Sequence, residues 1–289
     1  MRRPSIAFGL LITAATSAMA IDLNPLWNFD DPAQSEQRLR SALLSASGDD
    51  AFILQTQIAR SYGLRADFAK AQEILKTLEP KLQTADAEGR TRYWLELGRT
   101  YSSATHSPDS QTSDAKKSAR TAYKQAFESA KTAHLDGLAI DALHMLAFVD
   151  TAPADQLKWS REALAISQAS SQGPAKRWEP SLRNNIGYAL YQLGKYEDAL
   201  EQFKQAVVLR EQGKDVQATR IAHWMVGWTL RALNRIDEAL VIQLRLERER
   251  EAAGAPSPYV FEELELLYRA KGDETRADHY AQLRKSVDK

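Results

Sequence analysis

Small and large residues recur together along this chain about every forty residues, and this period restricts the possible folds more than any other feature. The clearest copy begins with Trp94, Gly98 and Tyr101 and continues with Ala119 and Tyr123. Residues at spacings of three and four lie on one face of a helix. Small residues let two helices approach closely, and large ones fill the space between neighbouring pairs. A single pair cannot bury its apolar stripe, so the period predicts a row of stacked helical hairpins.

Six copies of this pattern can be aligned. The position of Gly98 recurs as Ala59, Gly98, about His144, Gly187, Gly227 and Glu265. Short turn sequences fall where the first helix of a hairpin must stop, at Gly194–Lys195, Asn234–Arg235 and Gly272–Asp273. Gly and Asn tolerate the left-handed conformation that ends a helix. We therefore predict an all-α, right-handed solenoid of about six helical hairpins, each with a helix A and a helix B.

Two copies carry a family pattern. Residues 94–101 match W-x2-L-G-x2-Y at every specified position. The copy from Ile186 to Ala206 repeats the Gly, Leu, Ala and aromatic positions. The chain thus resembles the tetratricopeptide-repeat family over most of residues 21–289. The resemblance implies an α-solenoid that binds a protein or peptide along a concave surface lined by helix A. The period is longer than the 34 residues of the family's standard unit, which leaves the superhelical geometry open.

The N-terminus has the pattern of an export signal. Arg2 and Arg3 precede the apolar run Ile6–Ala15, and Ala18-Met19-Ala20 gives the small-x-small pattern of a cleavage site. We expect residues 1–20 to be a signal peptide cleaved after Ala20, with a buried N-terminal helix as the alternative. The chain has no cysteine, hence no lipid-attachment site, and a periplasmic location is expected.

The remaining chain divides into two parts. Residues 21–48 are predicted to form an irregular arm that lays Trp27 on the array, followed by a capping helix from Ser35 to Ala46. Residues 49–289 form the solenoid, closed by a polar-faced helix from Thr275 to Val287. A Ser/Thr-rich insertion, Ser102–Ser113, separates the helices of the second hairpin; it is either a tolerated surface loop or a flexible lip beside a partner.

The charge balance disfavours polyanionic partners. Lys plus Arg and Asp plus Glu number 38 each, which leaves no electrostatic footprint for nucleic acid or an anionic membrane. The mixed run Arg245–Glu251 is interpreted as a solvated outer helix face. No later stretch is apolar enough to span a membrane.

The resemblance implies which residues would line the concave groove. Transferred by position, these are Arg60, Arg99, Asp141, Met145, Asn184, Tyr188, Tyr191, Trp224, Trp228, Arg231, Glu262 and Arg269. The set is rich in residue types that interfaces favour. In peptide-binding members of the family, an Asn at the position of Asn184 often bonds the backbone of the peptide. Asp141 occupies a position where a carboxylate-gripping member would be basic, so that clamp is not reproduced. Trp224 and Trp228 could instead be packing residues between A helices.

A catalytic function has little support in the sequence. There is no thiol, no Gly-rich phosphate loop, no HExxH and no G-x-S-x-G elbow. Asp141 and His144 have a spacing that could bind a metal, but such a pair is more often a polar contact. We expect no catalytic residue, metal or cofactor. The leading hypothesis is a peptide-binding adaptor or scaffold of the bacterial envelope. The alternatives are an assembly subunit that oligomerises or bridges an envelope complex, and a cryptic enzyme or small-ligand receptor.

Overall fold

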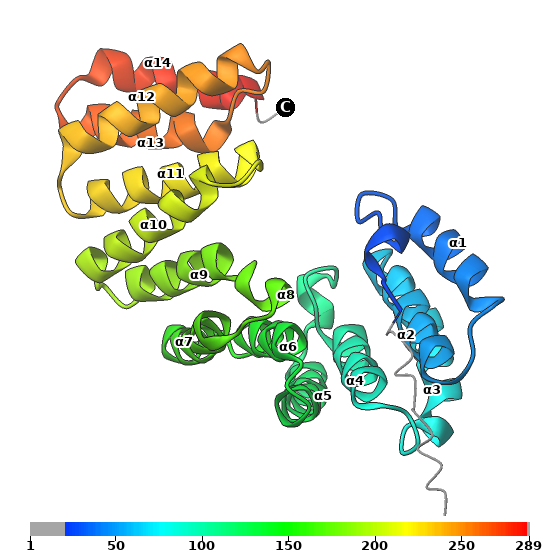
Figure 1. The fold of residues 1–289 in the computed structure, drawn as a ribbon. Coiled ribbons are helices and arrows are strands. Elements are labelled where there is room, and N and C mark those ends of the chain that lie inside the picture. Colours follow the sequence, from blue (N-terminus) through cyan, green and yellow to red (C-terminus); the bar gives the residue numbers. More distant parts are fainter. Residues whose placement is uncertain (1–20, 288–289) are drawn as a thin grey trace, which may run out of the picture.

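The computed structural model describes residues 21–287. The expected signal peptide, residues 1–20, lies outside the described range. Within that range the chain forms fourteen α-helices and three short 3-10 helices, and no strand. Helices that follow one another in the chain pack side by side from one end of the molecule to the other (Figure 1). The fold is an all-helical solenoid, as the sequence predicts.

All six hairpins form. Their helices A and B are α2 (Gly48–Leu64) with α3 (Phe68–Leu78), α4 (Ala87–Tyr101) with α5 (Ser113–Thr132), α6 (Asp136–Val149) with α7 (Pro153–Ala169), α9 (Glu179–Gln192) with α10 (Tyr196–Glu211), α11 (Val216–Ala232) with α12 (Ile236–Ala252), and α13 (Pro258–Ala270) with α14 (Glu274–Val287). Outside this scheme are α1 (Pro32–Leu43), α8 (Gly173–Lys176) and the 3-10 helices Asn24–Leu26, Glu79–Lys81 and Pro108–Ser110. The one-turn α8 had no counterpart in the sequence prediction.

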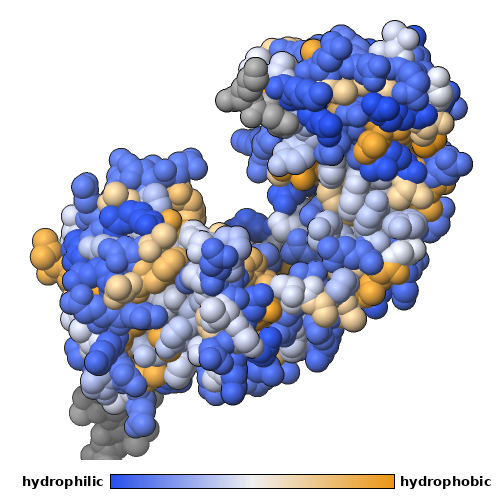
Figure 2. All heavy atoms as spheres, turned by 180° about the vertical axis from the view of Figure 1, so that it is seen from behind, coloured by the Kyte–Doolittle hydropathy of each residue, from blue (hydrophilic) through white to orange (hydrophobic). Residues whose placement is uncertain are grey.

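The row of hairpins curves into a crescent. In Figure 1 the A helices α4, α6 and α9 lie on its inner side, while the B helices α5 and α7 lie on its outer side. The first hairpin and the last hairpins form two arms. Figure 2 shows from behind that the space between these arms is open. Side chains of the A helices therefore line the concave face.

Close helix approach inside the hairpins explains the repeated glycines. A methyl group built on Gly98 would lie 2.7 Å from Cδ1 of Tyr123, and closer still to Cε1. At Gly187 the same methyl would lie 2.7 Å from Cε1 of Phe203. Both rings are fully buried, so neither can move aside without opening the core. The glycine in helix A and the ring in helix B form one packing unit.

The turns follow the predicted chemistry at three positions. Gly194, Asn234 and Gly272 have positive φ angles of 72°, 57° and 73°. Ala66 and His134 adopt the same left-handed conformation, with φ of 59° and 54°. The sequence analysis predicted neither turn: alanine disfavours that region, and His134, although its residue type is enriched there, is not part of a Gly or Asn turn sequence.

The N-terminal arm packs on the first hairpin. Trp27 is partly buried against a core formed by α1 and α2, and its ring stacks on Phe29 with centroids 4.9 Å apart. Helix α1 begins at Pro32, three residues before the predicted Ser35, because the Asp31 carboxylate caps it by accepting from the backbone of Gln34. It ends at Leu43 instead of Ala46.

The Ser102–Ser113 insertion is fastened to the first hairpin. The His106 ring stacks on Phe68 at 3.6 Å, and the Thr105 hydroxyl donates to the carbonyl of Gly63 over 3.1 Å. At its root, the Tyr123 hydroxyl donates to the carbonyl of Ser102 over 2.7 Å. The segment is thus an ordered wall beside the A helices α2 and α4.

We expect Gly98→Ala to lower the free energy of unfolding by about 1–3 kcal/mol, because overpacking against Tyr123 outweighs the better helix propensity of alanine. The matched control is Gly63→Ala, where an added methyl meets nothing within 4 Å. That control should be neutral or stabilising by up to about 1 kcal/mol. Urea unfolding measures both. Equal effects of the two substitutions would contradict the packing account.

Candidate functional site

A chain of pockets runs along the A helices. The central pocket, of about 280 Å³, lies between α2, α4 and α6, with the insertion on one side and Trp178 on another. A wider N-terminal pocket of about 560 Å³ adjoins it and shares Arg60, Asp141 and Trp178. A third, small pocket of about 250 Å³ shares His144 and Phe148 with the central one and reaches Tyr188. The three pockets are neighbours along the A helices, since each outer pocket shares lining residues with the central one, and together they are called the hollow.

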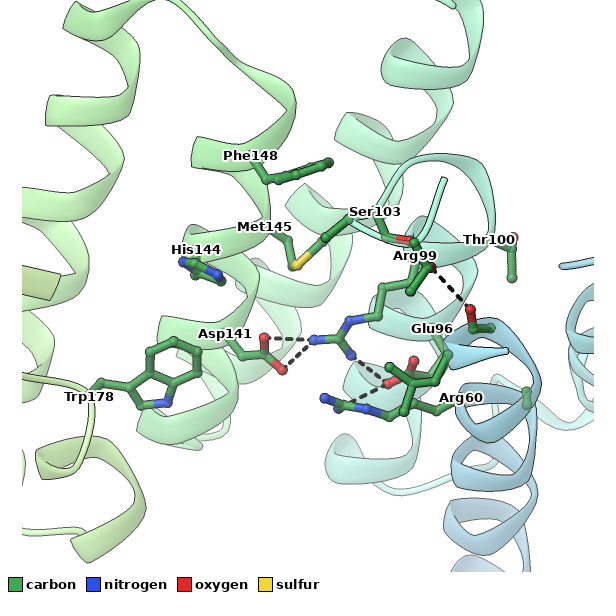
Figure 3. Close-up of a pocket in the computed structure, with 15 residues that line it drawn as sticks. Arg60, Glu96, Arg99, Thr100, Ser103, Asp141, His144, Met145, Phe148 and Trp178 are labelled. Carbon is green, nitrogen blue, oxygen red and sulfur yellow. Dashed lines mark hydrogen bonds and ion pairs between the residues drawn. The ribbon is translucent and has the colours of Figure 1, made fainter. Parts of the chain in front are cut away.

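Four charged side chains, the arginine cluster (Arg60, Glu96, Arg99 and Asp141), form the floor of the central pocket (Figure 3). Nη2 of Arg99 donates to both carboxylate oxygens of Asp141 at 2.7 Å, and its Nη1 donates to Oε1 of Glu96 at 2.5 Å. Nη1 of Arg60 lies 3.5 Å from the same Glu96 oxygen. The cluster ties together α2, α4 and α6.

The charges of the cluster balance one another. Burial lowers the pKa of Arg99, but the attraction of Asp141 and Glu96 outweighs it and raises that pKa overall. Burial raises the pKa of Asp141, and the two guanidinium groups reverse this effect and hold it below the ordinary value. Each partner is therefore stabilised in its charged form. Two positive and two negative charges leave the floor of the pocket neutral overall.

Arg60 is the least satisfied member. Burial and then the like charge of Arg99 lower its pKa. Its guanidinium carbon lies 5.6 Å from the ring centroids of Trp27 and Phe29, in the range of a cation–π contact. Its Nε and the Oε2 of Glu96 are buried without a hydrogen-bond partner among the described residues. These two atoms are a donor and an acceptor that a bound group could satisfy.

One wall of the central pocket comes from α6. His144, Met145 and Phe148 follow Asp141 on this helix, and Trp178 faces the His144 ring with centroids 5.3 Å apart. Burial lowers the pKa of His144, against the opposing influence of Asp141, so this wall is uncharged near neutral pH. Asn184 lines the small pocket and makes no hydrogen bond to another described side chain.

A second feature, the aromatic row (Tyr188, Tyr191, Trp224, Trp228 and Tyr259), crosses α9, α11 and α13. Its centre is the Trp228 ring, which stacks on Tyr191 at 3.5 Å, Trp224 at 5.8 Å and Tyr188 at 6.2 Å. Trp224 makes an edge contact with Tyr259 at 6.4 Å. Tyr188 is 43% exposed and Tyr259 67% exposed. The tryptophans are half-buried: one side packs on the core, and the row as a whole reaches the surface.

The remaining predicted groove residues are used within the array. Arg231 donates through two nitrogens to the buried carboxylate of Glu263, both at 2.8 Å, which joins α11 to α13. Glu262 pairs with Arg284. Arg269 pairs with Glu265, Glu274 and Asp278 and contributes to none of the pockets described here. Arg99 and Arg231, both predicted to line the groove, join consecutive A helices through these ion pairs.

Three residues at these sites escaped the sequence prediction. Glu96 precedes Arg99 by three positions, a spacing that places both on one helix face and could have indicated the pair. Trp178 reaches the central pocket because α8 displaces it from the hairpin pattern. Tyr259 lies in the first turn of the last A helix, α13, before the positions that the repeat pattern selects. Periodicity selected only the repeated positions and missed residues that lie between or before them.

The arrangement of acidic and histidine residues does not form a metal centre in residues 21–287, where no group of three or more such side chains converges. Asp141 and His144, considered above as a metal pair, contact Arg99 and Trp178 respectively. None of the described helices combines the length and hydropathy needed to cross a membrane.

Residues 178–246 match the family model of the tetratricopeptide repeat. This range covers α9, α10, α11 and the larger part of α12. No curated protein matches the chain. The match lies within a solenoid of helical hairpins that extends on both sides of it in residues 21–287.

Three solved structures are similar to this chain at low sequence identity. A signal transduction ATPase with numerous domains and a tetratricopeptide repeat sensor, from Pyrococcus horikoshii, is 15% identical with a TM-score of 0.69; the match covers 89% of this chain and 39% of that one. BtubC (BKLC) from P. vanneervenii is 16% identical, with a TM-score of 0.41 and coverage of 93% and 91%. The apo quorum sensor NprR from B. thuringiensis is 12% identical, with a TM-score of 0.32 and coverage of 92% and 96%. The chain spans less than half of the ATPase.

We expect Asp141→Asn to destabilise the protein by about 3 kcal/mol at pH 7, because it leaves the buried Arg99 without its main partner. The neighbouring arginines depress the pKa of Asp141. Its contribution to stability is therefore complete above the ordinary value of 3.8 and is lost as pH falls through the depressed pKa. The difference in the free energy of unfolding between the wild type and Asp141→Asn should therefore become smaller in acid.

Denaturant unfolding between pH 7 and pH 3 measures this difference. The control is Asp237→Asn, since Asp237 is 83% exposed and pairs only with Lys271; its effect should stay within about 0.5 kcal/mol. An Asp141→Asn variant as stable as that control would show that the cluster does not hold the A helices together.

Proposed function

We propose that this protein is an adaptor or scaffold that binds another protein through a peptide segment or helix on its concave face. The aromatic row carries the proposal. Large, rigid rings that are only half-buried give much contact area at low entropic cost, and Trp and Tyr are the residues most enriched at binding hot spots. A fold that merely needed to stack its hairpins would gain nothing from leaving Tyr188 and Tyr259 exposed.

The hollow supports the same function. Its small pocket contains Tyr188 of the aromatic row together with Asn184, and shares Phe148 with the central pocket, so one extended segment could contact both features. Asn184 offers a side-chain amide, with a donor and an acceptor suited to a peptide backbone. The arginine cluster is internally neutral, so it favours a partner with uncharged polar groups at that end over a strongly charged one.

The ligand segment is therefore expected to be apolar or aromatic where it meets the row. A helix would place residues i, i+3, i+4 and i+7 against it, as amphipathic helices do in grooves. The assembly and enzyme alternatives have no comparable feature in their favour among the described residues.

We expect Trp228→Ala to weaken binding of a selected peptide by about 2 kcal/mol, or roughly thirtyfold, because this ring is the centre of the row. Binding peptides would first be selected from a displayed random library, with the protein of residues 21–289 as the target. Their affinities would then be measured by calorimetry. The control is Trp159→Ala, on the outer helix α7. Circular dichroism reports whether either variant loses helicity.

If Trp228→Ala and Trp159→Ala weaken binding equally, the peptide does not use the aromatic row. If Trp228→Ala unfolds the protein, Tyr188→Ala replaces it, because the Tyr188 side chain is 43% exposed and its loss leaves the core intact. Unchanged peptide affinity in the Tyr188 variant would then reject the concave face as the binding surface.

We further propose that the protein works in the bacterial periplasm, on the basis of the signal pattern in residues 1–20. Expressed with its full N-terminus in a Gram-negative host, it should appear in the periplasmic fraction, with Ile21 as its first residue by mass spectrometry. The control lacks residues 2–20 and should stay in the cytoplasm. A full-length chain retained there with Met1 would contradict export.

A further inference from the structure

A separate, C-terminal pocket of about 280 Å³ is lined in part by Trp224, which also belongs to the aromatic row. Its apolar lining comes from Ile221, Trp224, Met225, Leu246 and Val260, with Tyr259 at its edge. Two arginines, Arg220 on α11 and Arg250 on α12, complete the lining. Apolar walls with two cations on one side are the chemistry of a site for an amphiphile with an anionic head.

The two cations are poorly compensated. Arg250 has no carboxylate within ion-pair distance in the part of the chain that the structure describes. Nη2 of Arg220 donates to the backbone carbonyl of Glu249 at 3.1 Å, while its Nε lies 3.5 Å from the Glu249 carboxylate without a hydrogen bond. The Glu249 carboxylate is 41% exposed and is shared with Arg245 at 3.6 Å. Glu249 is thus shared by Arg220 and Arg245, and Arg250 pairs with no acid among the described residues.

Electrostatics and helix geometry favour an anion at the same place. Arg220 and Arg250 line the same pocket, and like charges close together repel each other. Burial, and then the charge of Arg220, accordingly lower the pKa of Arg250. An anion between them would relieve this repulsion. Ser257 also lines the pocket, directly before the first turn of α13, and its hydroxyl does not cap that helix. The partial positive charge of the helix N-terminus adds to the two arginines.

The pocket volume limits the ligand. An engineered apolar cavity of about 150 Å³ holds benzene, so a pocket nearly twice as large holds a tail of roughly ten carbon atoms. Membrane phospholipids, with two long chains, are too large for it. A guanidinium pair binds a carboxylate through bidentate hydrogen bonds.

We propose that the C-terminal pocket binds a small amphiphilic monocarboxylate, with the acyl or aromatic tail among Ile221, Trp224 and Leu246 and the carboxylate on Arg220 and Arg250. This activity is independent of the peptide-binding function. Trp224 and Tyr259 belong both to this pocket and to the aromatic row. A ligand bound in the pocket therefore contacts two rings of the row and can change the concave surface at its C-terminal end.

The test uses octanoate as the probe, titrated into residues 21–289 by calorimetry up to about 10 mM. Octanoate should bind. Each methylene removed from the tail should weaken binding about fourfold, so hexanoate, which is two methylenes shorter, should bind more weakly than octanoate. Octanol, with the same tail and no charge, should bind at least about tenfold more weakly. Arg250→Gln should weaken octanoate binding by about tenfold or more and leave octanol unchanged.

The matched control is Arg248→Gln, on the same helix but outside the pocket lining, which should bind octanoate as the wild type does. Arg220→Gln is the second variant, with circular dichroism to verify its fold. Absence of octanoate binding, equal affinity for octanol, or equal weakening by Arg248→Gln would each overturn the proposal. So would binding of peptides with a free apolar C-terminal residue but not of octanoate, which would make the pocket a subsite of the peptide groove.

Discussion

Every part of this structure depends on one constraint: a helical hairpin of this size cannot bury its own apolar face. The hairpins acquire a core only by stacking, and stacking requires their two helices to lie close together. Gly98 beneath Tyr123 and Gly187 beneath Phe203 show how this is achieved. Because each glycine of helix A has no side chain, the aromatic ring of helix B lies directly against it, and the two helices can approach closely. The same ring then fills the interior, where both Tyr123 and Phe203 have no exposed surface.

Charged groups add a second level of connection between hairpins. The Arg99–Asp141 pair joins α4 to α6, and the Arg231–Glu263 pair joins α11 to α13. Both link successive A helices, so they lie along the inner face of the crescent. Buried ion pairs contribute little net stability compared with apolar contacts, but they strongly penalise any arrangement that separates the partners. Such pairs therefore fix how neighbouring A helices sit, and with that the shape of the hollow between them.

The inner face is consequently divided into regions of different chemistry. The N-terminal half has a neutral, polar floor, with buried hydrogen-bonding atoms of Arg60 and Glu96 left unused. The C-terminal half has stacked rings centred on Trp228. Beyond them, Arg220 and Arg250 line an apolar pocket, and only Arg220 lies near a carboxylate, that of Glu249, among the described residues. A partner that covers the whole face would meet uncharged polar groups, then aromatic surface, then positive charge.

The sequence by itself determined the class of fold, the six hairpins and the turns at Gly194, Asn234 and Gly272. These follow from interactions over a few residues: the helical spacing of small and large side chains, and the backbone freedom of Gly194, Asn234 and Gly272. It also placed Tyr188, Tyr191, Trp224 and Trp228 on neighbouring A helices, because their spacing follows the repeat. The tertiary structure alone decided which charges find each other. Asp141 lies 42 residues after Arg99 and Glu263 lies 32 after Arg231, and no local pattern reveals such partners. It also decided the roles of Trp178, in the turn after α8, and of Tyr259, in the first turn of α13. The same holds for Arg250, which the alternating charges of its helix had assigned to solvent. Stacking of the hairpins, through contacts between residues far apart in the chain, produced these sites.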